Sequence, residues 1–104
     1  MATYLCLVAG RLDDVLTSLV VDDESGVVRV VGRTATGPRP MPVVVDAARA
    51  LVHVGNGGDP HSITTVTWAP DGSTSPVVTV DCPIAQTYMS VVGDLLMAVS
   101  YAGC

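Results

Sequence analysis

The sequence predicts an all-β fold, and three observations lead to that prediction. Of the 104 residues, 20 are Val and 10 are Thr, and β-branched side chains favour strands. The apolar runs are short and end at Gly, Pro, Asp or Ser, which is typical of strands separated by turns. The one helix-like stretch, residues 46–50, is too short to be a stable helix and has strand signals on both sides.

The apolar runs predict nine strands in order along the chain. We expect them at residues 4–8, 15–21, 27–32, 42–45, 51–55, 63–68, 77–80, 88–92 and 95–100. The segments between them are rich in turn-forming residues, above all 22–26, 37–40, 57–60 and 70–73. Successive strands joined by short turns reverse direction, so we expect antiparallel pairing.

Composition and charge exclude several classes of protein. With 49 % hydrophobic and 14 % charged residues, the chain is too apolar for intrinsic disorder, and its single Glu and lack of Lys exclude a coiled coil. A net charge of −5 argues against nucleic acid or an anionic membrane as a partner. No apolar run approaches the roughly 20 residues of a membrane span, and the first residues do not resemble a signal peptide, so a cytoplasmic location is expected.

The three cysteines do not indicate a metal site or a disulfide framework. Cys6, Cys82 and Cys104 are an odd number of cysteines. The sequence has neither Cys-x-x-Cys nor His-x-x-x-His spacing. We expect two buried apolar thiols and one terminal thiol. The sequence indicates no metal or organic cofactor.

A weak internal repeat indicates the architecture. Residues 52–58 align with residues 96–102 at an offset of 44, and residues 15–20 align with residues 63–68 at an offset of 48. A period of about 46 residues that holds four short strands is the signature of a β-propeller blade. The fold class predicted is therefore all-β, with four-stranded antiparallel propeller blades.

The order of the strands predicts an incomplete ring. If the strands of a blade are named A to D from the central channel outward, the chain runs B-C-D over residues 3–33, A-B-C-D over residues 40–81 and A-B over residues 87–103. Nine strands make about two blades, whereas closed propellers have about 4–8. We therefore expect residues 1–104 to be a partial propeller domain, a fragment of a larger ring.

Several segments resemble the seven-bladed β-propeller lactonases, which include bacterial 6-phosphogluconolactonase and related muconate-lactonizing enzymes. The segments that carry the resemblance are GPRPMPVVVD at 37–46, LVHVGN at 51–56, ITTVTWAPDG at 63–72 and LMAVSYAG at 96–103. They are similar to the family's Gly-x-x-Pro motif, its Leu-Tyr-Val-Ala-Asn strand, its C strand with the following turn, and its Ser-Tyr-Gly-Gly strand end. Ala47 and Ala48 stand where the family has Pro-Asp.

The resemblance implies the first two of seven blades of an enzyme that hydrolyses a sugar-acid lactone such as 6-phosphogluconolactone. Water would attack the ester carbonyl, and the catalytic His, Glu and Arg residues of the family belong to later blades. No catalytic residue is therefore assigned in this chain, and the chain alone is expected to be inactive. The alternative is a non-enzymatic propeller module for binding or scaffolding, which associates with itself or a partner through open edge strands.

Loop geometry selects candidate substrate-binding residues. In alternating strands, the D–A and B–C loops share one end of the blades, where propeller sites usually lie. The candidates there are Arg39, Asn56, His61, Ser100 and Tyr101. Arg39 could bind a phosphate or carboxylate bidentately, or be a solvated loop charge. His61 could polarise a lactone carbonyl or activate water, or be a turn residue after a proline.

Two further residues invite functional interpretation but are expected to be structural. His53 lies inside a strand among Leu51, Val52 and Val54, so we expect a partly buried histidine with its hydrogen bonds satisfied. Trp68 ends a strand, and we expect it to pack between blades rather than stack on a ligand.

Overall fold

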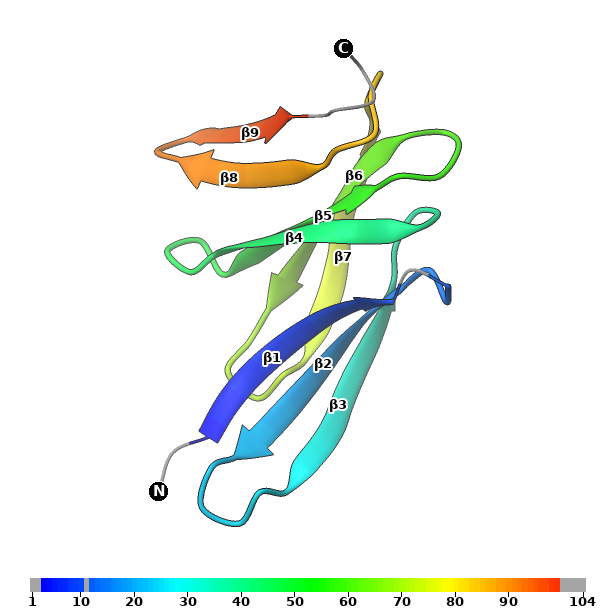
Figure 1. Cartoon of the computed structure of the whole chain (residues 1–104). Coiled ribbons are helices and arrows are strands. Elements are labelled where there is room, and N and C mark those ends of the chain that lie inside the picture. Colours follow the sequence, from blue (N-terminus) through cyan, green and yellow to red (C-terminus); the bar gives the residue numbers. More distant parts are fainter. Residues whose placement is uncertain (1–2, 11, 100–104) are drawn as a thin grey trace.

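The described part of the chain folds into nine strands that form three antiparallel sheets (Figure 1). The computed structural model describes residues 3–10 and 12–99. Sheet 1 contains β1 (Thr3–Gly10), β2 (Val15–Asp22) and β3 (Val28–Ala35). Sheet 2 contains β4 (Pro40–Asp46), β5 (Leu51–Asn56), β6 (Ser62–Trp68) and β7 (Thr74–Asp81). Sheet 3 contains β8 (Tyr88–Val92) and β9 (Leu95–Val99). Each sheet keeps its strands in chain order. The described residues include no helix capable of crossing a membrane.

The structure confirms the all-β prediction and all nine strands. Several strands extend beyond their predicted bounds, and two of these extensions include a proline, since β4 begins at Pro40 and β7 begins at Thr74 and continues through Pro76. Both are edge strands of sheet 2. The pairing register shifts between Pro40 and Val43 and again opposite Pro76. Proline has no N–H to donate, so it is tolerated at edges and bulges of this kind. No helix forms over residues 46–50, as predicted: Asp46 ends β4, and residues 47–50 form a turn.

The three sheets stack face to face in the order of the chain (Figure 1). Strand β1 lies against β4, β4 lies against β8, and β3 lies against β7. Sheet 2 is therefore the middle layer. One of its faces packs on sheet 1, and the other packs on the two strands of sheet 3.

The main core lies between sheets 1 and 2. Its fully buried side chains are Leu16 from β2, Val52 and Val54 from β5, and Val66 from β6. Leu7, Ala9, Val43 and Trp68 are partly buried around this cluster. Alternate residues of a strand point to the same face, which is why Val52 and Val54 both reach the core. Trp68 lies between the sheets as predicted, and its indole N–H donates to the Leu51 carbonyl at 3.2 Å.

Buried hydroxyl groups also join sheet 1 to sheet 2. Ser18 is fully buried, and its hydroxyl donates to the Gly72 carbonyl at 2.6 Å. Thr34 of β3 is hydrogen bonded through its hydroxyl to Thr74 of β7. Buried polar groups are costly without partners, so these bonds fix one relative position of the two sheets.

The prediction of buried thiols is wrong for the two cysteines that the structure describes. Cys6 and Cys82 are free and only half-buried. Cys6 belongs to the face of sheet 1 that points away from sheet 2, and Cys82 follows the end of the edge strand β7. Cys104 lies outside the described residues.

Candidate functional site

The loops between the strands gather at two opposite ends of the sheet stack (Figure 1). The first loop end holds the β1–β2, β3–β4, β5–β6 and β7–β8 connections, and the second holds the others. Backbone hydrogen bonds tie the first loop end together, from Thr36 N–H to the Asp14 carbonyl at 3.0 Å and from Gly57 N–H to the Arg39 carbonyl at 2.9 Å. Of the predicted substrate-binding candidates, Arg39, Asn56 and His61 belong to this end.

Arg39 has a fixed backbone and an exposed side chain. Its φ of 55° lies in the left-handed region, which non-glycine residues rarely adopt. The backbone N–H of Arg39 donates to Asp14 Oδ1 at 2.8 Å, and its carbonyl accepts from Gly57. Its guanidinium makes no ion pair with any residue that the structure describes. The first loop end therefore presents a free cation on a well-held loop.

Asn56 is fully buried beneath the first loop end rather than at its surface. Its Nδ2 donates to Ser62 Oγ and to Thr64 Oγ1, each at 2.9 Å, and so ties β5 to β6. Gly37 lies directly over this amide, because a Cβ at Gly37 would be 2.7 Å from Asn56 Nδ2. Asn56 therefore supports the loops from below, and its amide is not in reach of a ligand at the surface.

His61 is a half-buried turn residue. Its Nδ1 lies 2.8 Å from the Gly58 carbonyl, which can only accept, so Nδ1–H donates this hydrogen bond. Its own carbonyl accepts from Cys82 N–H at 2.8 Å and so links this loop to the segment after β7. The remaining candidates, Ser100 and Tyr101, lie outside the described residues.

The second loop end contains an ionic cluster centred on Arg49. The guanidinium donates from Nη1 to Asp46 Oδ2 at 2.8 Å and to the Gly93 carbonyl at 3.0 Å, and from Nη2 to Asp94. The hydrogen bond from Arg49 lowers the pKa of the buried Asp46 carboxyl against the opposing effect of burial. The cluster joins the β4–β5 turn to the β8–β9 turn and so holds sheet 3 on sheet 2.

His53 lies behind this cluster and has a structural environment. A cavity of about 160 Å³ is lined by His53 together with Asp46, Arg49 and Leu96. His53 Nδ1 is 2.8 Å from Thr65 Oγ1, and burial lowers the pKa of the imidazole although Asp46 opposes the shift. The interpretation of His53 as a partly buried, hydrogen-bonded histidine is confirmed. Within the described part of the chain, no three His, Cys, Asp or Glu side chains gather as a metal site would require.

The outer face of sheet 3 is apolar, and no residue that the structure describes covers it. Its side chains alternate along β8 and β9, and opposite pairs such as Tyr88 with Val99 and Val92 with Leu95 lie on this face. These four residues and Met97 are between 55 % and 67 % exposed, and Ser90 is the one polar residue among them. An exposed apolar patch of this kind usually marks an interaction site.

The outer face of sheet 1 has the same character. Tyr4, Val8, Val28 and Val30 are between 46 % and 57 % exposed on it. Their cross-strand neighbours on the same face include Leu19, which pairs with Val30, and also Thr17 with the exposed Arg33. The stack therefore ends in a largely apolar sheet face on both sides. The predicted association concerned open edge strands, whereas the exposed apolar surface lies on these two faces. Residues 95–99 are apolar at every position, which is typical of strands covered on both sides.

Comparison with known proteins identifies no family: no family model and no curated protein matches this chain. Function must therefore be inferred from the geometry of the loops and of the two outer faces.

Proposed function

We propose that this chain is a β-propeller-type assembly module whose sheets act as successive blades. In this proposal, the outer face of sheet 3 packs on the outer face of sheet 1 of a second copy. The observation that carries it is the pair of apolar faces at opposite ends of one stack.

The packing inside the chain supports this direction of assembly. Each sheet places one face on the next sheet in chain order, with β1 against β4 and β4 against β8. Continuing that order brings a further sheet 1 onto the free face of sheet 3. A contact between two unlike faces is heterologous, and such contacts close into rings when the rotation per copy permits.

The chemistry of the two faces also favours this contact. Both faces are built from exposed Val, Leu, Met and Tyr side chains. Fully burying an exposed side chain of this kind is worth about 1.5–3 kcal/mol. These side chains are about half exposed, so each contributes about half of that, and several buried together can offset the loss of freedom on association. The Arg49 cluster lies at the second loop end and remains outside this contact.

Size-exclusion chromatography with light scattering tests the proposal directly. We expect the chain to elute as a discrete multimer, and Leu95→Glu on sheet 3 to reduce its mass to that of one chain. Leu12→Glu is the matched control, because Leu12 is 95 % exposed in the β1–β2 turn and belongs to neither face. A wild-type chain that stays monomeric at all accessible concentrations would contradict the proposal.

The first loop end supports a second candidate function, the binding of a sugar-acid lactone as in the propeller lactonases. The observation that favours it is the unpaired guanidinium of Arg39 on a loop held by Asp14 and Gly57. A guanidinium binds phosphate or carboxylate with two parallel hydrogen bonds. We expect 6-phosphogluconate, the stable hydrolysis product, to shift the amide signals of Gly57 and Gly58 in an NMR titration.

Arg39→Gln should abolish those shifts, because the glutamine amide keeps some hydrogen bonding but loses the charge. Shifts that persist in Arg39→Gln, or that appear only at the second loop end, would contradict this candidate function. Turnover of 6-phosphogluconolactone is not expected of this chain alone, since no catalytic residue of the family is matched within it.

A further inference from the structure

A cavity of about 330 Å³ lies between sheets 1 and 2, away from both outer faces. It is lined by Leu5 and Leu7 of β1, Val43 and Val45 of β4, and Trp68 of β6. The volume falls at the lower end of the usual range for ligand pockets, about 300–1,000 Å³. An apolar cavity of about 150 Å³ is already large enough to bind benzene.

Trp68 gives this cavity a rigid aromatic wall. The hydrogen bond from its Nε1–H to the Leu51 carbonyl fixes the position of the indole and satisfies its one polar group. The ring therefore offers only apolar surface to the cavity. A flat aromatic ligand could make an offset-stacked or edge-to-face contact with it, which adds to the gain from burial.

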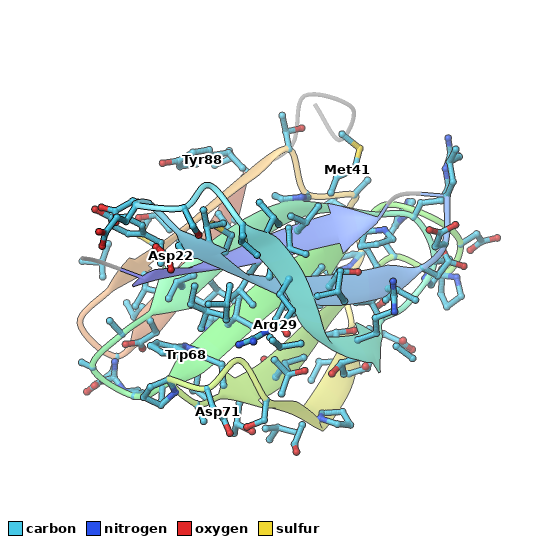
Figure 2. The ribbon with its side chains drawn as sticks, turned by 90° about the horizontal axis from the view of Figure 1, so that it is seen from below. Asp22, Arg29, Met41, Trp68, Asp71 and Tyr88 are labelled. Carbon is cyan, nitrogen blue, oxygen red and sulfur yellow. The ribbon has the colours of Figure 1, made fainter. Side chains whose placement is uncertain are left out.

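Arg29 supplies a positive charge on the same side of sheet 1. Leu5 pairs with Val20, and Val20 pairs with Arg29, so these three side chains share the face that points toward sheet 2. Figure 2 shows the side chain of Arg29 extending toward Trp68.

Close packing at Gly72 brings the turn after Trp68 against this row. A Cβ at Gly72 would lie 3.5 Å from Leu5 Cδ1. Arg29 and Asp22 line a neighbouring hollow on this side of sheet 1 without forming an ion pair, and the hydrogen bonds given for Asp22 and Asp71 are local. Asp71 accepts hydrogen bonds from Ser73, and Asp22 accepts from the backbone N–H of Glu24. Arg29 itself forms no ion pair within the part of the chain that the structure describes.

We propose that this pocket binds a small aromatic carboxylate, with the ring against Trp68 and the carboxylate toward Arg29. The apolar lining selects the ring, and the charge of Arg29 selects an anion over a cation or a neutral molecule. The site lies between sheets 1 and 2 and does not depend on the assembly through the outer faces.

The chain has a single Trp, so its fluorescence reports on this pocket directly. We expect 3-phenylpropanoate to change the Trp68 emission in a saturable way. The neutral 3-phenylpropan-1-ol should bind roughly 1.4- to fivefold more weakly, since an exposed ion pair is worth about 0.2–1 kcal/mol. 3-Phenylpropylamine should bind most weakly of the three. Arg29→Gln should remove the preference for the acid and leave the affinity for the alcohol unchanged.

A second variant tests the cavity itself. Val45 is half exposed at the cavity, so Val45→Phe can fill the space without disturbing the core. It should weaken all three probes, whereas Val80→Phe, at an exposed position outside the cavity, should weaken none. Circular dichroism confirms that each variant is folded. No saturable change with any probe, equal affinity for acid and amine, or equal loss in both Phe variants would overturn the proposal.

Discussion

Replacing Gly72 with alanine should destabilise the fold much more than the same replacement at Gly26. Both glycines have positive φ, 90° at Gly72 and 73° at Gly26, so both variants carry the strain of a left-handed alanine. A Cβ at Gly26 would meet nothing within 4 Å. A Cβ at Gly72 would lie 2.1 Å from Val31 Cγ2, across the contact between sheets 1 and 2.

The magnitude follows from these two contributions. Left-handed backbone costs an L-residue about 1–2 kcal/mol, and this loss is common to both variants. Overpacking adds about 1–3 kcal/mol, and it applies only at Gly72, where Val31 must move. The shift also disturbs the buried hydrogen bond from Ser18 to the Gly72 carbonyl. We therefore expect the free energy of unfolding to differ by about 2 kcal/mol between the two variants.

Urea unfolding followed by Trp68 fluorescence measures this difference, because Trp68 lies between the same two sheets. The Gly72→Ala curve should shift to much lower urea than the Gly26→Ala curve, with a similar slope. Equal destabilisation of the two variants would refute the placement of the β6–β7 turn against sheet 1.

Three further predictions concern the core and the second loop end. Leu16→Ala should lower the free energy of unfolding by about 2–5 kcal/mol, whereas Leu12→Ala at an exposed turn should change it by less than about 0.5 kcal/mol in the same urea assay. Because the pKa of folded His53 lies below 6.5, acidification below pH 6.5 protonates the unfolded chain first. The melting temperature of the wild-type chain should therefore fall as the pH drops below 6.5. The melting temperature of His53→Gln should fall less over the same pH range. Because the pKa of folded Asp46 lies below 3.8, its charge stabilises the fold above that pH, and this stabilisation is lost as the pH falls below 3.8. The melting temperature of Asp46→Asn should therefore fall less below pH 3.8 than that of the wild-type chain.

The strands could be predicted because their signals are local. Each apolar run of Val, Leu and Thr ends at a turn former, and the structure places a strand on every one. The ends of β4 and β7 could not be predicted, because Pro40 and Pro76 are acceptable only at edges or bulges. Edge position is a property of the assembled sheet, and no local pattern shows it.

The candidate site could be predicted only in outline. Loop alternation placed Arg39 and His61 at one end, but it could not show that Gly37 covers Asn56, since that contact joins residues 19 positions apart. The ionic cluster was also missed. Its Asp46–Arg49 half lies at i, i+3 and could have been suspected, whereas Asp94 is brought there by the packing of sheet 3 on sheet 2. Contacts between sheets depend on how the sheets stack, which the sequence pattern does not fix.

The association of unlike faces is tested most directly by mixing two variants. Val30→Glu damages the outer face of sheet 1, and Leu95→Glu damages the outer face of sheet 3. Light scattering should show each variant alone with the mass of one chain. In an equimolar mixture, the intact sheet 3 face of Val30→Glu should pack on the intact sheet 1 face of Leu95→Glu. The product should be a heterodimer of twice that mass and nothing larger, because only the two damaged faces are then left. If Val30→Glu alone keeps the mass of the wild-type assembly, or if the mixture remains monomeric, the account of head-to-tail assembly is contradicted.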